Sequence, residues 1–228
     1  MSFEIAIRLT EILLAIAFIQ QSIEHLCLPR NDRRLFLLRI VLSIALLVGS
    51  GSQWLCLGLF FNGLWILKRF DGPYNGGADR MSMLILSCLC LIYFIPLQFA
   101  KYIFAYLALQ VIFSYFVAGW VKVINREWRS GQALEDIFSF SAFPASESLR
   151  SWANAPRVLL ALGSWSVIGF ELLFPLVLCS QPALLIGLVF ACCFHLINIY
   201  ILGFNRFVWV WLAAYPSVIW FQTYLASF

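Results

Sequence analysis

The sequence predicts an all-α, polytopic transmembrane helix bundle of six to eight spans, and three observations support this fold class. Of the 228 residues, 63% are hydrophobic and 11% are charged, whereas soluble domains are about 45–50% apolar and about 25% charged. The mean hydropathy is +0.91. Apolar runs of roughly 20 residues, the length that crosses a bilayer core about 30 Å thick, recur along the chain. We therefore expect residues 1–228 to form a single integral membrane domain, multi-pass and surrounded by lipid.

The first apolar helix carries polar residues along one face and is expected to be retained, because it lacks the basic start and clean apolar centre of a signal peptide. Arg8 and Glu11 lie three residues apart, so their charges can neutralise one another. Pro29 and the arginines after it end this helix. Residues 35–67 would make one helix about 50 Å long, but residues 49–52 read Gly-Ser-Gly-Ser. We prefer two short spans here, which gives eight in all, and keep one long kinked helix as the alternative.

The rest of the chain alternates between polar connectors and five further apolar stretches. We expect these spans at residues 81–97, 102–121, 158–179, 182–204 and 207–226. The longest polar segment, residues 123–157, mixes aromatic with charged side chains, so we expect an interfacial loop with short amphipathic helices there.

Lysine and arginine are unevenly distributed between the connectors. With eight spans, only Lys101 lies on one side of the membrane, and the other side carries the clusters at residues 30–34, 68–80 and 122–157 and Arg206. The positive-inside rule makes the basic side cytoplasmic and places both termini outside. If residues 35–67 cross only once, everything after them inverts.

Several classes of function are not expected. The net charge of +4 is spread over short connectors and not over a basic patch with interleaved aromatics, so we expect no nucleic-acid partner. Most of the seven cysteines lie inside apolar runs, which argues against a secreted disulfide scaffold. Two histidines without zinc-type Cys/His spacing predict no metal site. The glycine-rich loop at residues 70–81 lacks the phosphate-binding lysine motif.

Three ionisable residues, Lys122, Glu171 and His195, are expected at membrane depth, where a charge costs roughly 2.5–3.5 kcal/mol and so needs a partner or a function. Glu171 and His195 each lie about ten to thirteen residues from the turn at residues 181–182. They should reach similar depth and could form a proton relay, with Asn198 one turn after His195. Lys122 could lose its charge and act as a base. The alternatives are that Lys122 extends to the interface and that Glu171 and His195 form a structural pair.

Three segments resemble one family of membrane proteins, in the same order. They are YNGGADRM (74–81), YFVAGWVKVINREWRSGQAL (115–134), and FELLFPL (170–176) followed by FHLINIYILGFNRFVWVWLAAYP (194–216). These segments are similar to patterns of the bacterial HTTM-domain proteins, a group that also contains vitamin K-dependent gamma-carboxylase. The resemblance implies an HTTM-like helix bundle.

The resemblance also implies roles for residues in these segments. In the carboxylase, the lysine of the Ala-Gly-lysine segment is assigned as the base that deprotonates the reduced quinone, a role that would fall on Lys122. Glu171 and His195 are our further catalytic candidates, as proton carriers. The candidates for substrate binding are Asn75, Asp79, Trp128, Asn198 and Arg206.

This sequence departs from the carboxylase in two respects. The essential carboxylase histidine that follows the loop asparagine is replaced by Gly76 here, and the large lumenal domain of the carboxylase is not matched. We therefore do not expect gamma-carboxylation by this chain alone. The carboxylase site also opens to the lumen, whereas the eight-span count places Lys122 on the cytoplasmic side, so one of these two expectations is wrong.

The sequence supports two functional hypotheses. The first is a membrane-embedded enzyme or redox subunit that binds a lipid-soluble quinone or a peptide between its helices. The second is a non-catalytic partner in the maturation, export or immunity of a peptide or protein, with residues 123–157 as the docking surface. The expected partners are membrane lipid and a peptide substrate or a membrane or secreted protein. A transporter is the third class and has less support, because the sequence shows no inverted repeat.

Overall fold

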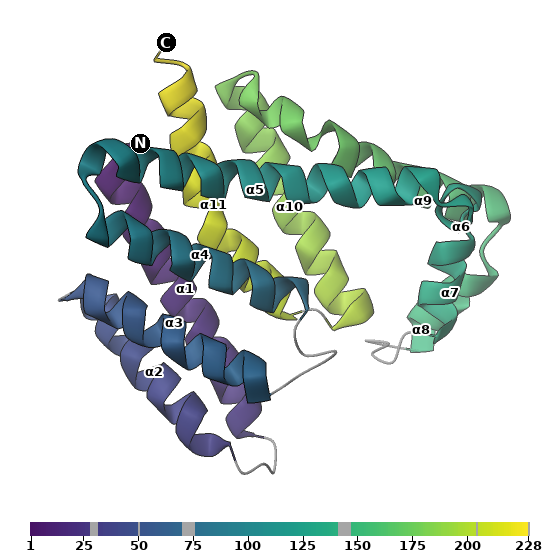
Figure 1. Cartoon of the computed structure of the whole chain (residues 1–228). Coiled ribbons are helices and arrows are strands. Elements are labelled where there is room, and N and C mark those ends of the chain that lie inside the picture. The colour runs from purple at the N-terminus through teal and green to yellow at the C-terminus, as the bar shows by residue number, and fades with distance from the viewer. Residues whose placement is uncertain (28–31, 50, 70–75, 141–146, 204, 228) are drawn as a thin grey trace. The chain divides into compact units, whose positions relative to one another are not determined.

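The computed structural model describes residues 1–27, 32–49, 51–69, 76–140, 147–203 and 205–227, and all regular elements in these ranges are helical (Figure 1). This confirms the expected all-α class. The elements are α1 (Phe3–Leu26), α2 (Arg33–Val48), α3 (Ser52–Arg69), α4 (Gly77–Phe94), α5 (Leu97–Ile124), α6 (Arg126–Ser130), α7 (Gln132–Phe140), α8 (Glu147–Arg150), the 3₁₀ helix η1 (Ser151–Asn154), α9 (Arg157–Leu173), the 3₁₀ helix η2 (Phe174–Leu178), α10 (Gln181–Leu202) and α11 (Asn205–Leu225).

Among the described residues, four helices are long and apolar enough to cross a membrane. They are α4, α5, α9 continued by η2 to Leu178, and α10. Large apolar side chains on these helices are exposed, as lipid-facing residues are; on α10, Val189 and Phe190 are 63% and 61% exposed. The expected total of six to eight spans includes further helices besides these four, and that total stays a prediction.

Residues 1–109 and 209–228 form one compact unit, built from α1 to α4, the first part of α5 and most of α11. Its interior is filled by fully buried side chains, among them Leu14, Phe18 and Leu59. Phe3 of α1 contacts the rings of Phe104 in α5 and Trp220 in α11, with ring centroids 5.7 and 5.2 Å apart.

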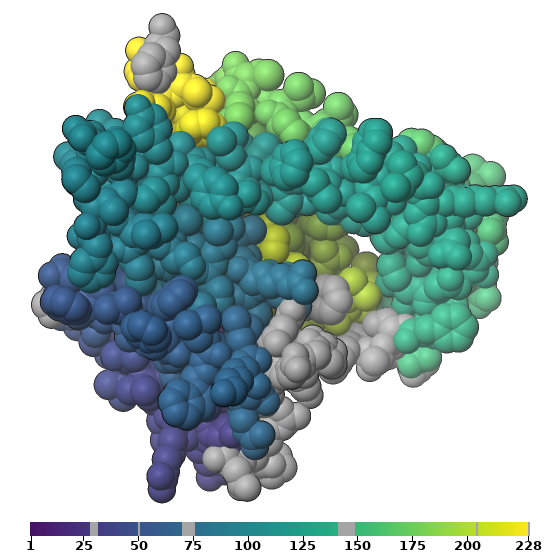
Figure 2. All heavy atoms as spheres, in the orientation of Figure 1, coloured from purple at the N-terminus to yellow at the C-terminus, as the bar shows by residue number. Residues whose placement is uncertain are grey.

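Residues 35–67 form two helices and not one kinked helix, so the single-helix alternative is wrong. Helix α2 ends at Val48 and is followed by Gly49, whose φ of 87° is left-handed, and Gly51 has a φ of 71°. Such angles favour glycine, because it has no Cβ to clash with the backbone. Helices α2 and α3 pack side by side in Figure 1, and Figure 2 shows atoms of α3 in blue at the molecular surface. Whether each of them crosses the membrane stays a prediction.

Residues 110–208 form the second compact unit, from the latter part of α5 to the start of α11. Between α5 and α9 the described residues contain the short helices α6, α7, α8 and η1. Their place at the membrane surface stays a prediction. Helix α9 gives way to η2 at Phe174, one residue before Pro175, because proline cannot donate the backbone hydrogen bond of a continuing α-helix.

Candidate functional site

Lys122 of α5 and Glu171 of α9 form an ion pair. The Lys122 Nζ lies 2.8 and 2.6 Å from the two carboxylate oxygens of Glu171 and donates to both. The Glu171 side chain is 4% exposed and that of Lys122 is 18% exposed. Both residues lie on helices that can cross a membrane, so the pair neutralises two charges that lipid would disfavour.

A close approach of α5 and α9 brings this pair together. Gly119 lies three residues before Lys122 on α5. A Cβ atom at Gly119 would lie 2.8 Å from the backbone nitrogen of Leu172 and 2.9 Å from the Cβ of Glu171. Glycine therefore lets the two helix backbones approach, as small residues do between membrane helices, and the Lys122 side chain reaches the carboxylate.

Trp128 of α6 completes the surroundings of the Lys122 ammonium. Nζ lies 5.1 Å from the centroid of the Trp128 ring, within the cation–π range of about 6 Å. Asn125 separates α5 from α6 and caps α6 with its side chain. The Ser164 hydroxyl of α9 donates to the backbone carbonyl of Trp128. The turn after α5 is thus attached to α9, which positions the indole beside the ion pair.

A second polar pair joins α5 to α10. The Tyr115 hydroxyl oxygen lies 2.6 Å from Nε2 of His195, and these residues are 4% and 5% exposed. The Tyr115 ring stacks on Phe174 with centroids 4.0 Å apart and meets Phe170 edge to face at 5.8 Å. Tyr115 precedes Lys122 by two helical turns, roughly 10 Å along the axis of α5.

The pairing of the ionisable groups differs from the sequence expectation. The sequence placed Glu171 and His195 at similar depth, where they could form a relay or a structural pair, whereas the structure pairs Glu171 with Lys122 and His195 with Tyr115. The 3₁₀ helix η2 lies between Glu171 and His195 along the chain. Its five residues wind at about three per turn instead of about 3.6, which rotates the chain after η2 by roughly 100° relative to a continuous α-helix. Counting residues to the turn therefore gives the depths of Glu171 and His195 but not the directions of their side chains relative to each other.

Comparison with known protein families identifies the fold in which these pairs lie. The model of the HTTM domain matches residues 96–223, more than half of the chain. The chain belongs to the HTTM-domain family. Together with the four long apolar helices, this makes it a membrane protein. The match runs from α5 to α11 and contains both polar pairs. No curated protein and no solved structure matches the chain.

The other expected site residues of this HTTM-domain protein are distributed more widely. Asp79 lies in the first turn of α4 and accepts a hydrogen bond from Nε2 of Gln21 at 3.2 Å. Asn198 of α10 and Arg206 of α11 are half-buried, and Asn75 falls outside the described residues. Of the expected residues, the structure thus brings Lys122, Glu171 and Trp128 together. Within the described ranges no three His, Cys, Asp or Glu side chains gather as metal ligands would.

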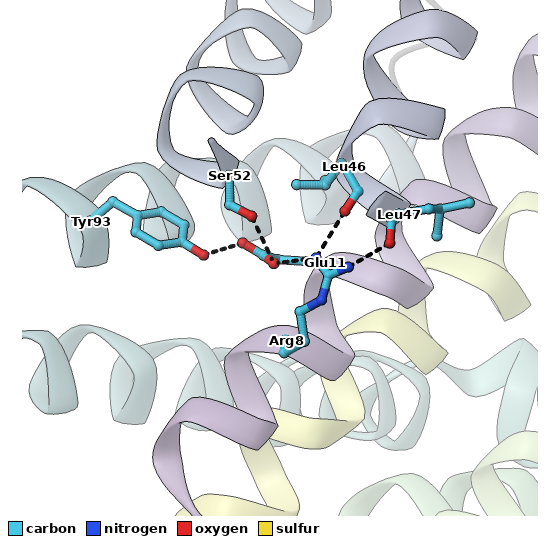
Figure 3. Close-up of polar contacts among 6 residues, drawn as sticks. All are labelled: Arg8, Glu11, Leu46, Leu47, Ser52 and Tyr93. Atoms are coloured by element: carbon cyan, nitrogen blue, oxygen red, sulfur yellow. Dashed lines mark hydrogen bonds and ion pairs between the residues drawn. The ribbon is translucent and has the colours of Figure 1, made fainter. Parts of the chain in front are cut away.

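A further charged cluster lies in the unit formed by residues 1–109 and 209–228. Arg8 and Glu11 form the expected pair, with Nη1 and Oε2 2.8 Å apart. The Arg8 guanidinium also donates to the carbonyls of Leu46 and Leu47, at 2.8 and 2.6 Å (Figure 3). These carbonyls belong to the last turn of α2, where helices leave acceptors without an intrahelical donor.

Glu11 extends the same cluster to two more helices. Its carboxylate accepts hydrogen bonds from Ser52, the first residue of α3, and from the Tyr93 hydroxyl of α4 (Figure 3). Glu11 is 1% exposed. The cluster therefore ties α1, α2, α3 and α4 together. The sequence predicted only the local Arg8 contact, because the other partners are distant along the chain.

Arg39 is a buried cation that the sequence analysis missed. It is 3% exposed and donates to the side-chain oxygens of Asn62 and Gln21, at 3.1 and 2.7 Å. Its guanidinium lies 4.4 Å from the ring centroid of Phe18. An arginine within the apolar stretch 35–67 was the available signal, because a cation at that depth calls for polar partners.

Proposed function

We propose that this HTTM-domain protein is a membrane-embedded enzyme in which Lys122 removes a proton from a lipid-soluble substrate of the reduced-quinone class. The observation that carries the proposal is the Lys122–Glu171 pair. In this pair a proton donor, the Lys122 ammonium, directly contacts a proton acceptor, the nearly buried Glu171 carboxylate. The Lys122 side chain is 18% exposed, so a substrate can still reach it.

The pair can supply a base through one internal proton transfer. A proton passes from the Lys122 ammonium to the Glu171 carboxylate, leaving a neutral amine and a carboxylic acid. Surroundings of low dielectric constant reduce the advantage that the charged forms have in water. The amine then takes the proton of a substrate hydroxyl, which produces the quinolate anion and restores the ammonium.

The residues around the pair would serve this step. The Trp128 ring beside the ammonium offers an aromatic face for a flat substrate. A second group able to transfer a proton is formed by Tyr115, on the same helix as Lys122, and His195, on the neighbouring α10. Glu171 stores the transferred proton until oxygen oxidises the quinolate, when the proton passes to the peroxide and the carboxylate is restored.

The test is oxidation of a reduced naphthoquinone by the purified full-length protein in lipid nanodiscs. A quinolate anion passes two electrons to dissolved oxygen faster than the neutral quinol does, giving quinone and hydrogen peroxide. Oxygen uptake therefore reports deprotonation. Lys122→Arg keeps a cation able to pair with Glu171, but a guanidinium does not give up its proton. General bases contribute about 10²–10⁴-fold, so we expect the rate above background to fall at least about 100-fold.

Lys101→Arg is the matched control, since Lys101 lies on the same helix, α5. It should keep the wild-type rate. If Lys122→Arg folds normally and also keeps the wild-type rate, Lys122 is not the base and the proposal is refuted.

A second function, as a non-catalytic partner in maturation, export or immunity of a peptide or protein, is favoured by one observation. Phe140 at the end of α7 is 81% exposed, and Trp152 of η1, which packs against α7, is 55% exposed. Such aromatic side chains can anchor a protein partner. Purification in mild detergent separates the two functions. Bound isoprenoid quinone supports the enzyme, whereas a stoichiometric protein partner that is lost with Phe140→Ser and Trp152→Ser supports the docking role.

A further inference from the structure

Four basic side chains gather at one end of the α2–α3 pair. Arg33 and Arg34 begin α2, Lys68 and Arg69 end α3, and all four are exposed. Because a short turn joins the two helices and they pack side by side, the start of α2 lies beside the end of α3. The ion pair between Arg69 and Asp32, with Nε and Oδ1 2.9 Å apart, joins these two ends directly. Asp32 offsets one of the four charges, which leaves an excess of positive charge here.

An apolar groove leads along α3 to this basic end. It is lined by Phe61, Leu64, Trp65, Lys68 and Arg69 and has a volume of about 610 Å³, within the range of about 300–1,000 Å³ that is typical of small-molecule sites. The lining residues follow one another at helical spacing, so they share one face of α3. Phe61 and Trp65 are 59% and 67% exposed, and α3 (blue) lies at the surface in Figure 2.

Polarity changes along this face in one direction. Phe61, Leu64 and Trp65 offer apolar and aromatic surface, and Lys68 and Arg69 follow within the next turn. Trp65 lies three residues before Lys68, an arrangement typical of the membrane interface, where aromatic rings sit at the level of the headgroups. A molecule that fits this face has an apolar chain joined to an anionic head.

We propose that this face of α3 binds one anionic phospholipid, with its phosphate at Lys68 and Arg69 and an acyl chain along Phe61, Leu64 and Trp65. The positive charge of the site selects the lipid headgroup. A zwitterionic lipid brings an ammonium group toward the cations, whereas phosphatidylglycerol brings only negative charge. The neighbouring Arg33 and Arg34 strengthen the same selection. The site is independent of the proposed function, which rests on residues 115–195.

The test uses native mass spectrometry of the full-length protein in detergent, with equal amounts of phosphatidylglycerol and phosphatidylcholine carrying identical chains. The wild type should retain phosphatidylglycerol preferentially. One basic residue near an anionic surface contributes about fivefold in affinity, so Lys68→Gln should lower the preference roughly fivefold. Lys68→Gln also leaves the Arg69–Asp32 pair intact, so the fold should be kept.

Two further variants assign the contacts. Arg126→Gln with Arg129→Gln removes two exposed basic residues of α6 and should leave the preference unchanged. Trp65→Ala should weaken the binding of both lipids without changing the ratio in which they are retained. Soluble glycerol phosphate should not compete, because it lacks the acyl chain. Equal retention of both lipids by the wild type, an unchanged preference in Lys68→Gln, or competition by glycerol phosphate would each overturn the proposal.

Discussion

Replacing Glu171 by leucine removes the carboxylate, keeps most of the side-chain volume and leaves the Lys122 ammonium without its counter-ion. Removing one partner of a buried ion pair costs about 3–5 kcal/mol. Lys122 is 18% exposed, and a long lysine side chain can move its ammonium toward a polar region. We therefore expect Glu171→Leu to lower the free energy of unfolding by about 2–4 kcal/mol.

A second substitution should restore much of this loss. In Lys122→Met with Glu171→Leu, both charges are replaced by apolar groups of similar size, and replacing a buried pair in this way is often neutral or stabilising. We expect the free energy of unfolding of the double variant to lie within about 1 kcal/mol of the wild-type value or above it. The double variant should thus be more stable than Glu171→Leu, although it carries one more change.

Unfolding by sodium dodecyl sulfate in mixed micelles, followed by circular dichroism, measures these differences. An exposed pair in the same unit provides the control: Arg157 and Glu135 are 57% and 34% exposed, with Nη1 and Oε2 3.0 Å apart. Glu135→Leu should cost at most about 1 kcal/mol. The reasoning is refuted if Glu171→Leu costs no more stability than Glu135→Leu. It is also refuted if the double variant loses as much stability as the single variants Lys122→Met and Glu171→Leu lose together.

Three further predictions rest on the described contacts. Gly119→Ala places a Cβ 2.8 Å from the backbone nitrogen of Leu172 and should cost about 1–3 kcal/mol by overpacking; an unchanged denaturation midpoint would contradict it. Tyr115→Phe removes the hydroxyl at His195 Nε2 and should cost about 1–3 kcal/mol, while His195→Phe added to Tyr115→Phe should recover part of the loss. Arg39→Lys keeps the charge but cannot reproduce both guanidinium contacts and should cost about 1.5–3 kcal/mol in the same assay, so wild-type stability would show that these contacts contribute little.

The sequence by itself determined the features that depend on composition and on short-range spacing. The apolar runs of roughly 20 residues predict the all-α membrane class, because lipid requires backbone polar groups to be hydrogen-bonded and a helix bonds them within one segment. The Gly-Ser-Gly-Ser run predicts the break at residues 49–52, since glycine readily adopts the left-handed angles that end α2. The Arg8–Glu11 pair is expected from a spacing of three residues on one helix.

Only the tertiary structure decided which distant groups meet. Whether Glu171 faces Lys122 or His195 depends on how α9 is rotated and on how closely it approaches α5. Gly119 permits this close approach. The partners of Arg39 likewise come from α1 and α3. Such contacts depend on packing between helices, and an angular change of one third of a turn, which residue counting does not detect, directs a side chain to a different neighbour.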